Sequence, residues 1–409
     1  MKLLFVHQNF PGQFKHLAPA LAAMPGNEVR ALAMHGRTGV AGIRVVNHKV
    51  ARQPGQNLHP WLRDAEAKVL RGESAYRAAQ AMRKEGFNPD VIVAHPGWGE
   101  SLFLKEVWPD ARLGIYSEFF YRASGADVGF DPEFPPKDPD DACRLRGKNI
   151  NSLMHFDIAD AGLSPTHWQA STFPEPFRSR ITVAHDGIDT DAVRPDPAIT
   201  LTLNGQNGKV CLTREDEVIT FVNRNLEPYR GYHIFMRALP EILRARPKAR
   251  VLIVGGDGVS YGAAAPDGKS WREIFLAEVS DQIDLRRVHF LGHLPYSQFL
   301  ALLQLSSVHV YLTYPFVLSW SLLEAMSAGC AIVASDTAPV REAIVPNQTG
   351  RLVDFFAPAA LAAEVVALSR DAETRQRLGA AARDFAQQHY DLHSICLPKQ
   401  KTWVEALAG

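Results

Sequence analysis

The chain has 409 residues, 46% of them hydrophobic and 22% charged, which is the composition of an ordinary folded protein. Its 44 Lys and Arg residues balance 44 Asp and Glu residues, so no net field favours a nucleic-acid partner. The 4 cysteines are widely spaced, which argues against a disulfide framework or a zinc site. A chain of this length predicts two domains of roughly 200 residues each.

The N-terminal residues 1–10 are typical of a first β-strand rather than a secretion signal, because their apolar run is short and polar residues follow it directly. No uninterrupted apolar run in the sequence approaches the ~20 residues that a membrane-spanning helix needs. We therefore expect a cytoplasmic chain, and peripheral contact with the inner membrane face is compatible with this expectation.

Strand and helix signals alternate along the first half of the chain. Residues 13–23 predict an amphipathic helix, and the proline-rich residues 131–141 predict a long surface loop, since proline fits neither helix interiors nor central strands. Short apolar runs predict strands at residues 2–7, 91–94, 112–116, 161–164 and 181–184.

A second series of elements begins near residue 218. Helices are predicted at residues 232–245 and 298–305, and the tail at residues 397–407 predicts an amphipathic helix. Residues 193–208 are rich in Pro, Asn and Gly and predict a linker between the two halves. Apolar runs predict strands at residues 218–223, 250–254, 288–291, 309–313, 331–335 and 350–353.

This alternation predicts an α/β fold with two doubly wound, Rossmann-like domains built on parallel sheets. We expect the domains at residues 1–194 and 195–385, with a helical tail at residues 386–409 that packs back on the first domain. In such folds ligands bind at the carboxyl ends of the strands, so a central cleft between the domains is the expected binding region.

Residues 306–330 form the most informative segment, a strand and a loop followed by a helix that begins at Ser319 or Ser321 and ends at Gly329. The free N–H groups at a helix N-terminus suit a phosphate. One turn into the helix, the Glu324 carboxylate can accept two hydrogen bonds from a vicinal diol such as a ribose. The alternative is a purely structural unit whose glutamate faces solvent.

Two arginines follow the first strand of the second half. Arg224 stands at the strand end and Arg230 precedes a glycine that begins the next helix, so both guanidinium groups can clamp a diphosphate. The alternative is a pair of exposed arginines in a polar loop. The glycine-rich residues 255–258 are only a fragment of a dinucleotide fingerprint and predict a tight turn near a nucleotide.

In the first half, polar residues again follow strand ends. Gly12 joins the first strand to the first helix and would let a ligand approach the backbone. His95 ends a strand and is followed by glycines, which favours a role in a site over a role in the core. Glu118 is a carboxylate on the same rim, and the neighbouring Tyr121 is expected to pack in the core or to stack on a sugar.

Taken together, these segments resemble the GT-B glycosyltransferases of the retaining family-4 type. The resemblance covers nearly the whole chain and implies that a nucleotide-sugar donor binds the C-terminal domain and the acceptor binds the N-terminal domain. It rests on residues 181–189, 224–231, 288–294 and 322–329, with a weaker match at residues 339–350.

The resemblance also implies roles for single residues. As the catalytic set, Arg224 and Arg230 would hold the donor diphosphate, Glu324 would bind the ribose, and His95 would lie close to the reacting carbon. Gly12 would lie near the transferred sugar, and Glu118 and Tyr121 would face the acceptor. The other donor-binding positions would be Gly256, His293, Leu294, Ser319, Trp320, Ser321 and Leu322.

One position departs from the family pattern. Phe316 stands eight residues before Glu324, where the family usually carries a second glutamate that touches hydroxyls of the donor sugar. Phenylalanine cannot accept those hydrogen bonds. Sugar recognition would then rely on backbone N–H groups near Ser319 or on apolar contact.

We therefore predict a retaining glycosyltransferase of the hexosyltransferase type, which moves a sugar from a UDP-, GDP- or ADP-sugar to a glycan, lipid-linked or small-molecule acceptor in surface polysaccharide or glycoconjugate synthesis. It is expected to need neither cofactor nor metal, because the nearest acidic cluster, residues 138–141, lies in a proline-rich loop.

Three alternatives remain open from the sequence. The first is a nucleotide-sugar epimerase or hydrolase of the same fold. The second is a nicotinamide-dependent oxidoreductase, which would rest on residues 255–258 but lacks the early glycine fingerprint of that class. The third is a catalytically silent nucleotide-sugar-binding protein, for which Phe316 is the only support.

Overall fold

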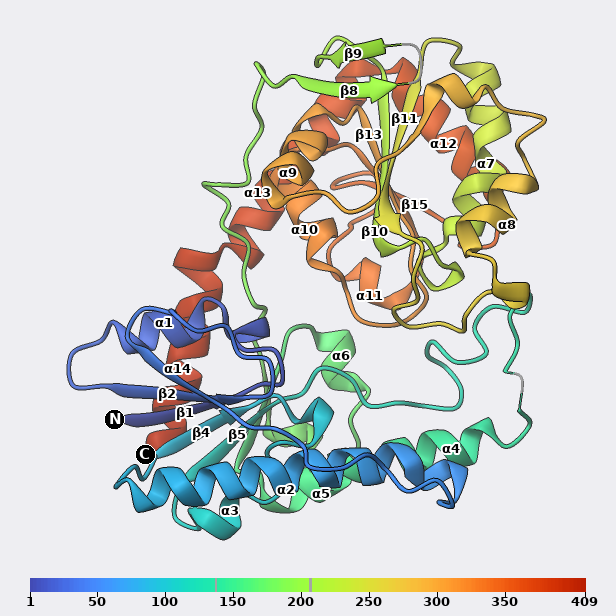
Figure 1. Cartoon of the computed structure of the whole chain (residues 1–409). Helices are drawn as coiled ribbons and strands as arrows, with labels where there is room; N and C mark the ends of the chain where they lie inside the picture. Colours follow the sequence, from blue (N-terminus) through green and yellow to red (C-terminus); the bar gives the residue numbers. More distant parts are fainter. Residues whose placement is uncertain (137, 206–207) are drawn as a thin grey trace. The chain divides into compact units, whose positions relative to one another are not determined.

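The computed structural model describes residues 1–136, 138–205 and 208–409. The chain forms two compact units, Met1–Gly187 with His393–Gly409 and Ile188–Leu392. Each unit contains a parallel β-sheet covered by helices on both faces (Figure 1), which confirms the predicted α/β fold. Among the described residues, no helix is both long enough and apolar enough to cross a membrane.

The units divide after Gly187 and after Leu392, whereas the sequence predicted boundaries after residues 194 and 385. The difference arises because the two connecting segments bind each other within the second unit. Thr190 Oγ1 donates a hydrogen bond to Asp391 Oδ2 at 2.6 Å, and the Leu392 N–H donates to the Ile188 carbonyl at 2.8 Å.

The first unit contains a seven-stranded parallel sheet in the order β3-β2-β1-β4-β5-β6-β7. The strands are β1 (Lys2–Val6), β2 (Glu28–Ala33), β3 (Ile43–Asn47), β4 (Val91–Ala94), β5 (Arg112–Tyr116), β6 (Ala161–Ser164) and β7 (Ile181–Val183). Its helices of more than one turn are α1 (Leu17–Ala22), α2 (Arg63–Lys84), α4 (Asp141–Lys148), α5 (Ile150–Ile158), α6 (His167–Ser171) and α14 (Leu397–Ala408). The sequence had not predicted β2, β3 or the long helix α2.

The first predicted helix is shorter than expected. A single 3-10 turn at Gly12–Phe14 precedes α1, which begins only at Leu17. The reason is Pro19, which has no N–H group to donate to the Lys15 carbonyl, so the α-helix cannot extend back through that residue.

The predicted tail helix is confirmed as α14, which packs against α1, β4 and β5 (Figure 1). Trp403 and Val404 on its inner face are buried. Gly114 of β5 allows this close packing, because a β-carbon there would lie 2.5 Å from the Trp403 ring. The last helix of the chain therefore completes the core of the first unit.

The second unit contains a six-stranded parallel sheet in the order β12-β11-β10-β13-β14-β15. Its strands are β10 (Val218–Asn225), β11 (Arg250–Gly256), β12 (Val288–Phe290), β13 (Val308–Tyr311), β14 (Ile332–Ser335) and β15 (Arg351–Val353). Its helices are α7 (Tyr232–Ala245), α8 (Trp271–Ala277), α9 (Tyr296–Leu305), α10 (Trp320–Ser327), α11 (Ala338–Arg341), α12 (Pro358–Arg370) and α13 (Ala372–Tyr390). Every strand predicted in this half is present within a few residues of its expected bounds.

The predicted linker at residues 193–208 is largely wrong. Part of it forms the antiparallel pair β8 (Leu201–Gly205) and β9 (Gly208–Leu212), while residues 206 and 207 lie outside the described residues. The alternating Leu201 and Leu203 supply the reason, because Leu203 and Leu212 are buried in the core of the second unit.

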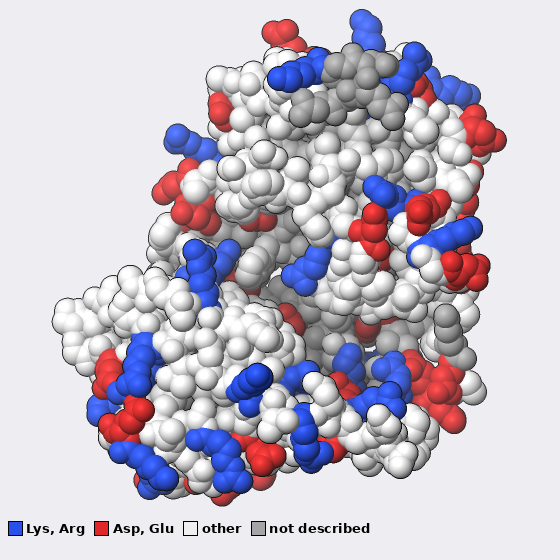
Figure 2. Space-filling model, in the orientation of Figure 1, with Lys and Arg blue, Asp and Glu red and all other residues white. Residues whose placement is uncertain are grey.

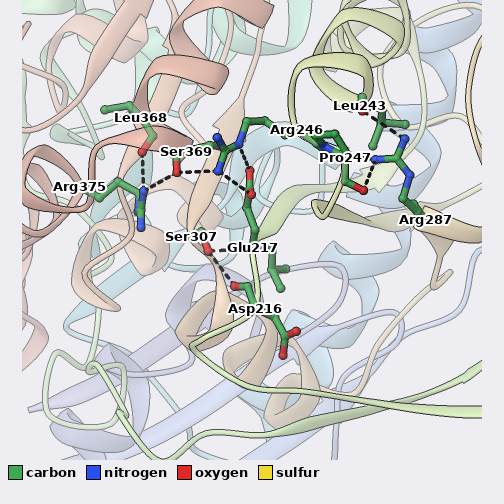
Figure 3. Close-up of polar contacts among 11 residues, drawn as sticks. Asp216, Glu217, Leu243, Arg246, Pro247, Arg287, Ser307, Leu368, Ser369 and Arg375 are labelled. Carbon is green, nitrogen blue, oxygen red and sulfur yellow. Dashed lines mark hydrogen bonds and ion pairs between the residues drawn. The ribbon is translucent and has the colours of Figure 1, made fainter.

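The amino-terminal edge of the six-stranded sheet is held by arginines (Figure 3). Arg246 forms a two-point ion pair with Glu217, with distances of 2.6 and 2.8 Å. Arg287 donates to backbone carbonyls at the end of α7, and Arg375 donates to those at the end of α12. Cationic side chains at helix C-termini satisfy carbonyls that have no partner within the helix. These arginines are structural.

Charges of both signs are interleaved over the face of the molecule in Figure 2, where Lys and Arg lie close to Asp and Glu on each unit. This pattern agrees with the balanced composition of 44 basic and 44 acidic residues. No extended field of one sign covers this face, so binding must depend on particular residues.

Candidate functional site

The carboxyl-terminal edge of the six-stranded sheet contains a cavity of about 200 Å³. It lies where β10 ends and where α10 begins, as expected for a ligand site in an open parallel sheet. Its lining residues are Val222, Asn223, Arg224, Asn225, Glu227, Arg230, Ser260, Tyr261, Ser319 and Ser321.

Arg224 is the penultimate residue of β10, and its side chain lines this cavity. The residue is exposed and makes no hydrogen bond or ion pair with any described residue. A guanidinium without a partner in the described part of the chain can offer its donors to an anionic ligand.

Arg230 lines the same cavity but is only 5% exposed. Its Nη1 donates to Thr313 Oγ1 at 2.7 Å and to the Val317 carbonyl at 3.2 Å. Burial disfavours its charge, but Tyr311 and neighbouring groups outweigh burial and raise the pKa of Arg230. The predicted pair of arginines therefore meets at one cavity, with one member fixed and the other available.

Glu227, which the sequence analysis did not single out, holds the wall of the cavity. Its buried carboxylate accepts backbone N–H groups from Ser260 at 3.2 Å, from Tyr261 at 3.3 Å and from Gly262 at 3.1 Å. This loop places the Tyr261 ring 5.0 Å from the Arg230 guanidinium. The only signal in the sequence was an acidic residue between the two arginines.

The start of α10 confirms part of the prediction. Ser319 is the N-cap residue, and its hydroxyl accepts the Ser321 N–H at 3.4 Å. The Ser319 N–H itself donates to the Tyr311 hydroxyl at 3.0 Å, so a sugar would have to use other backbone N–H groups near Ser319 or apolar contact. Leu322 is fully buried in the core, which excludes its side chain from a binding site.

Glu324 is buried, and the alternative that it faces solvent is wrong. Its Oε1 accepts a hydrogen bond from the Tyr296 hydroxyl at 2.8 Å. Tyr296 is the first residue of α9 and is 56% exposed. The sequence analysis missed this tyrosine, which fixes the orientation of the carboxylate.

Four further predicted donor positions lie outside the cavity lining. A β-carbon on Gly256 would lie 2.4 Å from His293 Nε2, so glycine allows the imidazole to approach the end of β11. His293 is exposed, whereas Leu294 and Trp320 are partly buried and pack against the core. The structure thus brings Gly256 and His293 together, as a site near a strand end requires.

Phe316 is 5% exposed and belongs to an aromatic cluster. Its ring centroid lies 5.4 Å from that of Tyr229 and 5.1 Å from that of Tyr261. Since Tyr261 lies over Arg230, the phenylalanine supports a residue of the cavity wall. The departure from the family pattern is therefore a packing feature.

The carboxyl-terminal edge of the seven-stranded sheet contains a second cavity, of about 100 Å³. Both predicted acceptor-side residues and His95 line it, which confirms that the three lie together. The lining residues are Lys68, His95, Pro96, Gly97, Ile115, Tyr116, Glu118, Phe119, Tyr121, Lys148, Asn151, Ser152, Phe156 and Phe173.

His95 is buried, with 3% of its surface exposed, at the end of β4. Its Nδ1 accepts the Gly97 N–H at 3.2 Å, which places the ring proton on Nε2. That nitrogen lies 3.6 Å from Glu118 Oε2, just beyond hydrogen-bonding distance. The geometry leaves a donor and a carboxylate facing each other at the cavity.

Two residues missed by the sequence analysis orient Glu118. His7 Nε2 donates to Gln13 Oε1 at 2.7 Å, since its Nδ1 accepts the Asn9 N–H, and Gln13 Nε2 donates to Glu118 Oε1 at 3.2 Å. Burial disfavours ionisation of Glu118, but His95, Gln13 and His7 outweigh it and hold its pKa below the usual value. Burial, with His95 nearby, lowers the pKa of His7 to about 4.

Gly12 has a backbone φ of +48°, and a β-carbon on it would lie 2.2 Å from the His7 ring. The space next to this glycine therefore belongs to His7. This corrects the expectation that Gly12 leaves room for a ligand. Its absence of a side chain is needed to position the imidazole that orients Gln13.

Tyr121 is half-buried and lines the cavity, which favours the second of its two predicted roles, contact with a sugar, over packing in the core. Asn149 holds its backbone by accepting from the Tyr121 N–H at 3.2 Å and donating to its carbonyl at 2.7 Å. The Lys148 ammonium lies 3.6 Å from the centroid of the ring.

Two parallel-sheet units, each with a polar cavity at the carboxyl edge of its sheet, define a protein of the GT-B class. Residues 25–193 match the model of the glycosyl transferase family 4 group, and residues 208–385 match that of the glycosyl transferases group 1. The chain belongs to this family, the GT-B glycosyltransferases of family 4, group 1.

Similar proteins include a D-inositol 3-phosphate glycosyltransferase of Corynebacterium efficiens, 30% identical over 42% of this chain and 39% of the relative. A glycogen synthase of Mycobacterium tuberculosis is 27% identical over 47% of this chain and 43% of the relative. The chain thus spans about half the length of the curated relatives it matches.

Two solved structures are similar over nearly all of both chains. Anabaena HepE in complex with UDP-glucose has a TM-score of 0.67 at 16% identity and covers 99% of this chain and 100% of its own. Sucrose-phosphate synthase from Thermosynechococcus elongatus has a TM-score of 0.70 at 15% identity and covers 100% and 99%. At these identities the similarity demonstrates a shared fold.

Proposed function

We propose that this protein is a glycosyltransferase that binds the diphosphate of a nucleotide-sugar donor at the cavity of the second unit. The observation that carries the proposal is that Arg224, whose guanidinium has no partner among the described residues, lines the same cavity as the buried Arg230. Two such groups can each bind phosphate oxygens bidentately, and a fixed cation needs little reorganisation when charge develops.

The comparisons support the class of donor. The relatives from Corynebacterium and Mycobacterium are named as a glycosyltransferase and a glycogen synthase, and the Anabaena protein binds UDP-glucose. For this chain we propose a UDP-, GDP- or ADP-sugar. The carboxylate of Glu324, held by Tyr296, would accept hydrogen bonds from the ribose hydroxyls.

We propose a retaining reaction. Arg224 and Arg230 stabilise the diphosphate as it leaves, and the acceptor hydroxyl attacks the anomeric carbon from the same face. The leaving phosphate oxygen then takes the proton of that hydroxyl. In the first unit, Glu118 and the Nε2–H of His95 bind and orient acceptor hydroxyls, because one accepts and the other donates.

We also propose that the reaction needs no metal, because the two guanidinium groups already supply positive charge at the diphosphate. A silent binding protein is less well supported than an enzyme. Phe316, which alone favoured that alternative, has a packing role beneath Tyr261.

The test is a transfer assay with UDP-, GDP- and ADP-glucose, with a panel of sugar and lipid-linked acceptors, in the presence and absence of EDTA. The proposal expects a product with the anomeric configuration of the donor, formed at the same rate in EDTA. Donor turnover without any acceptor would favour the epimerase or hydrolase. An inverted product, or activity that EDTA abolishes and Mg²⁺ restores, would contradict the proposed mechanism.

A further inference from the structure

The cavity of the first unit contains a cation whose N–H groups have no hydrogen-bond acceptor among the described residues. Lys148 is the last residue of α4 and lines the cavity. Its ammonium makes no hydrogen bond or ion pair within the described residues, and it lies over the face of the Tyr121 ring, 3.6 Å from the ring centroid. An aromatic face attracts a cation but leaves its three N–H donors unused.

The charged groups around Lys148 do not neutralise it. Asp64 and Asp127 favour its charge, whereas Lys68 and Arg144 oppose it. Asp64 is already engaged, because it accepts from Lys68 Nζ at 2.7 Å. Burial is the largest effect, and with the two cations it lowers the pKa of Lys148 to about 8. Glu118 lines the same cavity, but no carboxylate among the described residues lies within ion-pair distance of the Lys148 ammonium.

The cavity lining also includes two buried polar atoms that have no hydrogen-bond partner among the described residues. Asn151 Nδ2 donates to the Pro96 carbonyl at 2.6 Å, which leaves Asn151 Oδ1 as an unused acceptor. His95 Nε2, which carries the ring proton, is an unused donor. Buried polar groups are rarely left unpaired, and one hydroxyl can satisfy both an acceptor and a donor.

We propose that this cavity binds an acceptor that carries a phosphate or carboxylate group close to the hydroxyl that receives the sugar. The anionic group contacts Lys148, and a hydroxyl lies between Asn151 and His95. The cavity volume of about 100 Å³ accommodates several water molecules, and so a substituent of the acceptor rather than a large glycan. This inference rests on the proposed transferase function and names its acceptor class.

The test is a binding measurement that does not depend on turnover. Calorimetric titrations would compare glucose with glucose 6-phosphate and glucuronate, and myo-inositol with its 3-phosphate. A vesicle arm would compare phosphatidylinositol with phosphatidylcholine, which separates a lipid source of the anion from a soluble one. The variants are Lys148→Met and, as the matched control, Lys84→Met, which removes an exposed lysine at the end of α2, outside the cavity.

The anionic probe of each pair should bind the wild-type protein about 10- to 100-fold more tightly than the neutral probe, as expected for one charge-assisted contact. Lys148→Met should abolish that difference and Lys84→Met should retain it. Tight binding only to phosphatidylinositol vesicles, lost in Lys148→Met, would support the same site with a lipid source. Equal affinities for neutral and anionic probes, or equal behaviour of the two variants, would overturn the proposal.

The pH dependence adds a second readout. Preference for the anionic probes should decline above about pH 8 in the wild-type protein, because the Lys148 ammonium loses its proton there. Lys148→Arg keeps its charge and should shift that decline to higher pH; an unchanged profile would contradict the assignment. If anionic probes bind as expected but no donor sugar is ever transferred, the binding site stands and the transferase proposal fails.

Discussion

Arg246 and Arg224, at opposite edges of the six-stranded sheet, differ in whether the protein engages them. At the amino-terminal edge, Arg246, Arg287 and Arg375 engage a carboxylate or helix-end carbonyls (Figure 3). At the carboxyl-terminal edge, Arg224 engages nothing in the described part of the chain. The presence or absence of a hydrogen-bond or ion-pair partner, rather than the residue type, therefore distinguishes a structural arginine from one that is fully available to a ligand.

The direction of the helices explains this difference. In a parallel sheet every connecting helix ends near the amino-terminal edge, where its unpaired carbonyls attract guanidinium groups. Helices begin at the opposite edge, where N–H groups and partial positive charge repel cations and attract anions. An arginine that remains at that edge without a partner has an anionic ligand as its natural complement.

The largest expected effect is the loss of transferase activity in Arg224→Ala. Transfer from the nucleotide-sugar should fall roughly 100-fold or more, because a charge-assisted contact to the leaving diphosphate is lost. The melting temperature should not change, since the side chain has no partner to lose among the residues that the structure describes. Steady-state kinetics would check the fall in activity, and thermal denaturation would check the melting temperature. Wild-type turnover in the variant would show that Arg224 does not belong to the site.

For Arg246→Ala we expect the reverse, a loss of stability with little change in activity. Loss of its two-point ion pair with Glu217 leaves a half-buried carboxylate without its cation, which should lower the free energy of unfolding by about 2–3 kcal/mol. The kinetic constants at a permissive temperature should stay within twofold of wild type. Urea denaturation measures the stability, and a large fall in turnover without destabilisation would break the distinction between the two edges.

Glu227→Gln tests the cavity wall. The Glu227 carboxylate accepts hydrogen bonds from backbone N–H groups at residues 260–262. In the variant, the amide turns an N–H₂ group, which cannot accept a hydrogen bond, toward some of these N–H groups, so this loop should loosen. We expect the donor KM to rise about tenfold with a smaller change in kcat, because one charged acceptor of buried hydrogen bonds is lost. An unchanged KM would mean that the loop does not contribute to donor binding.

The smallest effect is expected for Tyr296→Phe, which removes only the hydroxyl that orients Glu324. Loss of one neutral-to-charged hydrogen bond at a half-exposed position should raise the donor KM by about threefold to tenfold. Glu324→Ala should then raise the donor KM more than Tyr296→Phe does. If the two variants raise the donor KM equally, Tyr296 binds the donor itself.

Much of the fold could be predicted because strands and helices leave local patterns. The run that forms β13, the cap at Ser319 and the glycine after α10 are all visible in sequence. The linker prediction failed because polar composition at residues 193–208 concealed the alternating leucines of β8. Strands β2 and β3 were missed, although β1, which pairs with β2, was found.

The candidate site was only partly predictable. The strand-end rule placed His95 with Glu118 and Arg224 with Arg230, but it could not identify residues that act through distant contacts. Gln13 and Glu118 are 105 residues apart in the chain, and no local pattern links them. Motif matching also gave no information on orientation, so the buried Leu322 was included and Tyr296 was not.

The most direct test of the central claim is calorimetric titration of UDP, GDP and ADP into the wild-type protein and into Arg224→Ala and Arg246→Ala. The nucleotide that binds the wild type should lose about 100-fold in affinity in Arg224→Ala and keep its affinity in Arg246→Ala. Equal affinity in the wild type and Arg224→Ala would contradict the assignment of the cavity between β10 and α10 to a diphosphate.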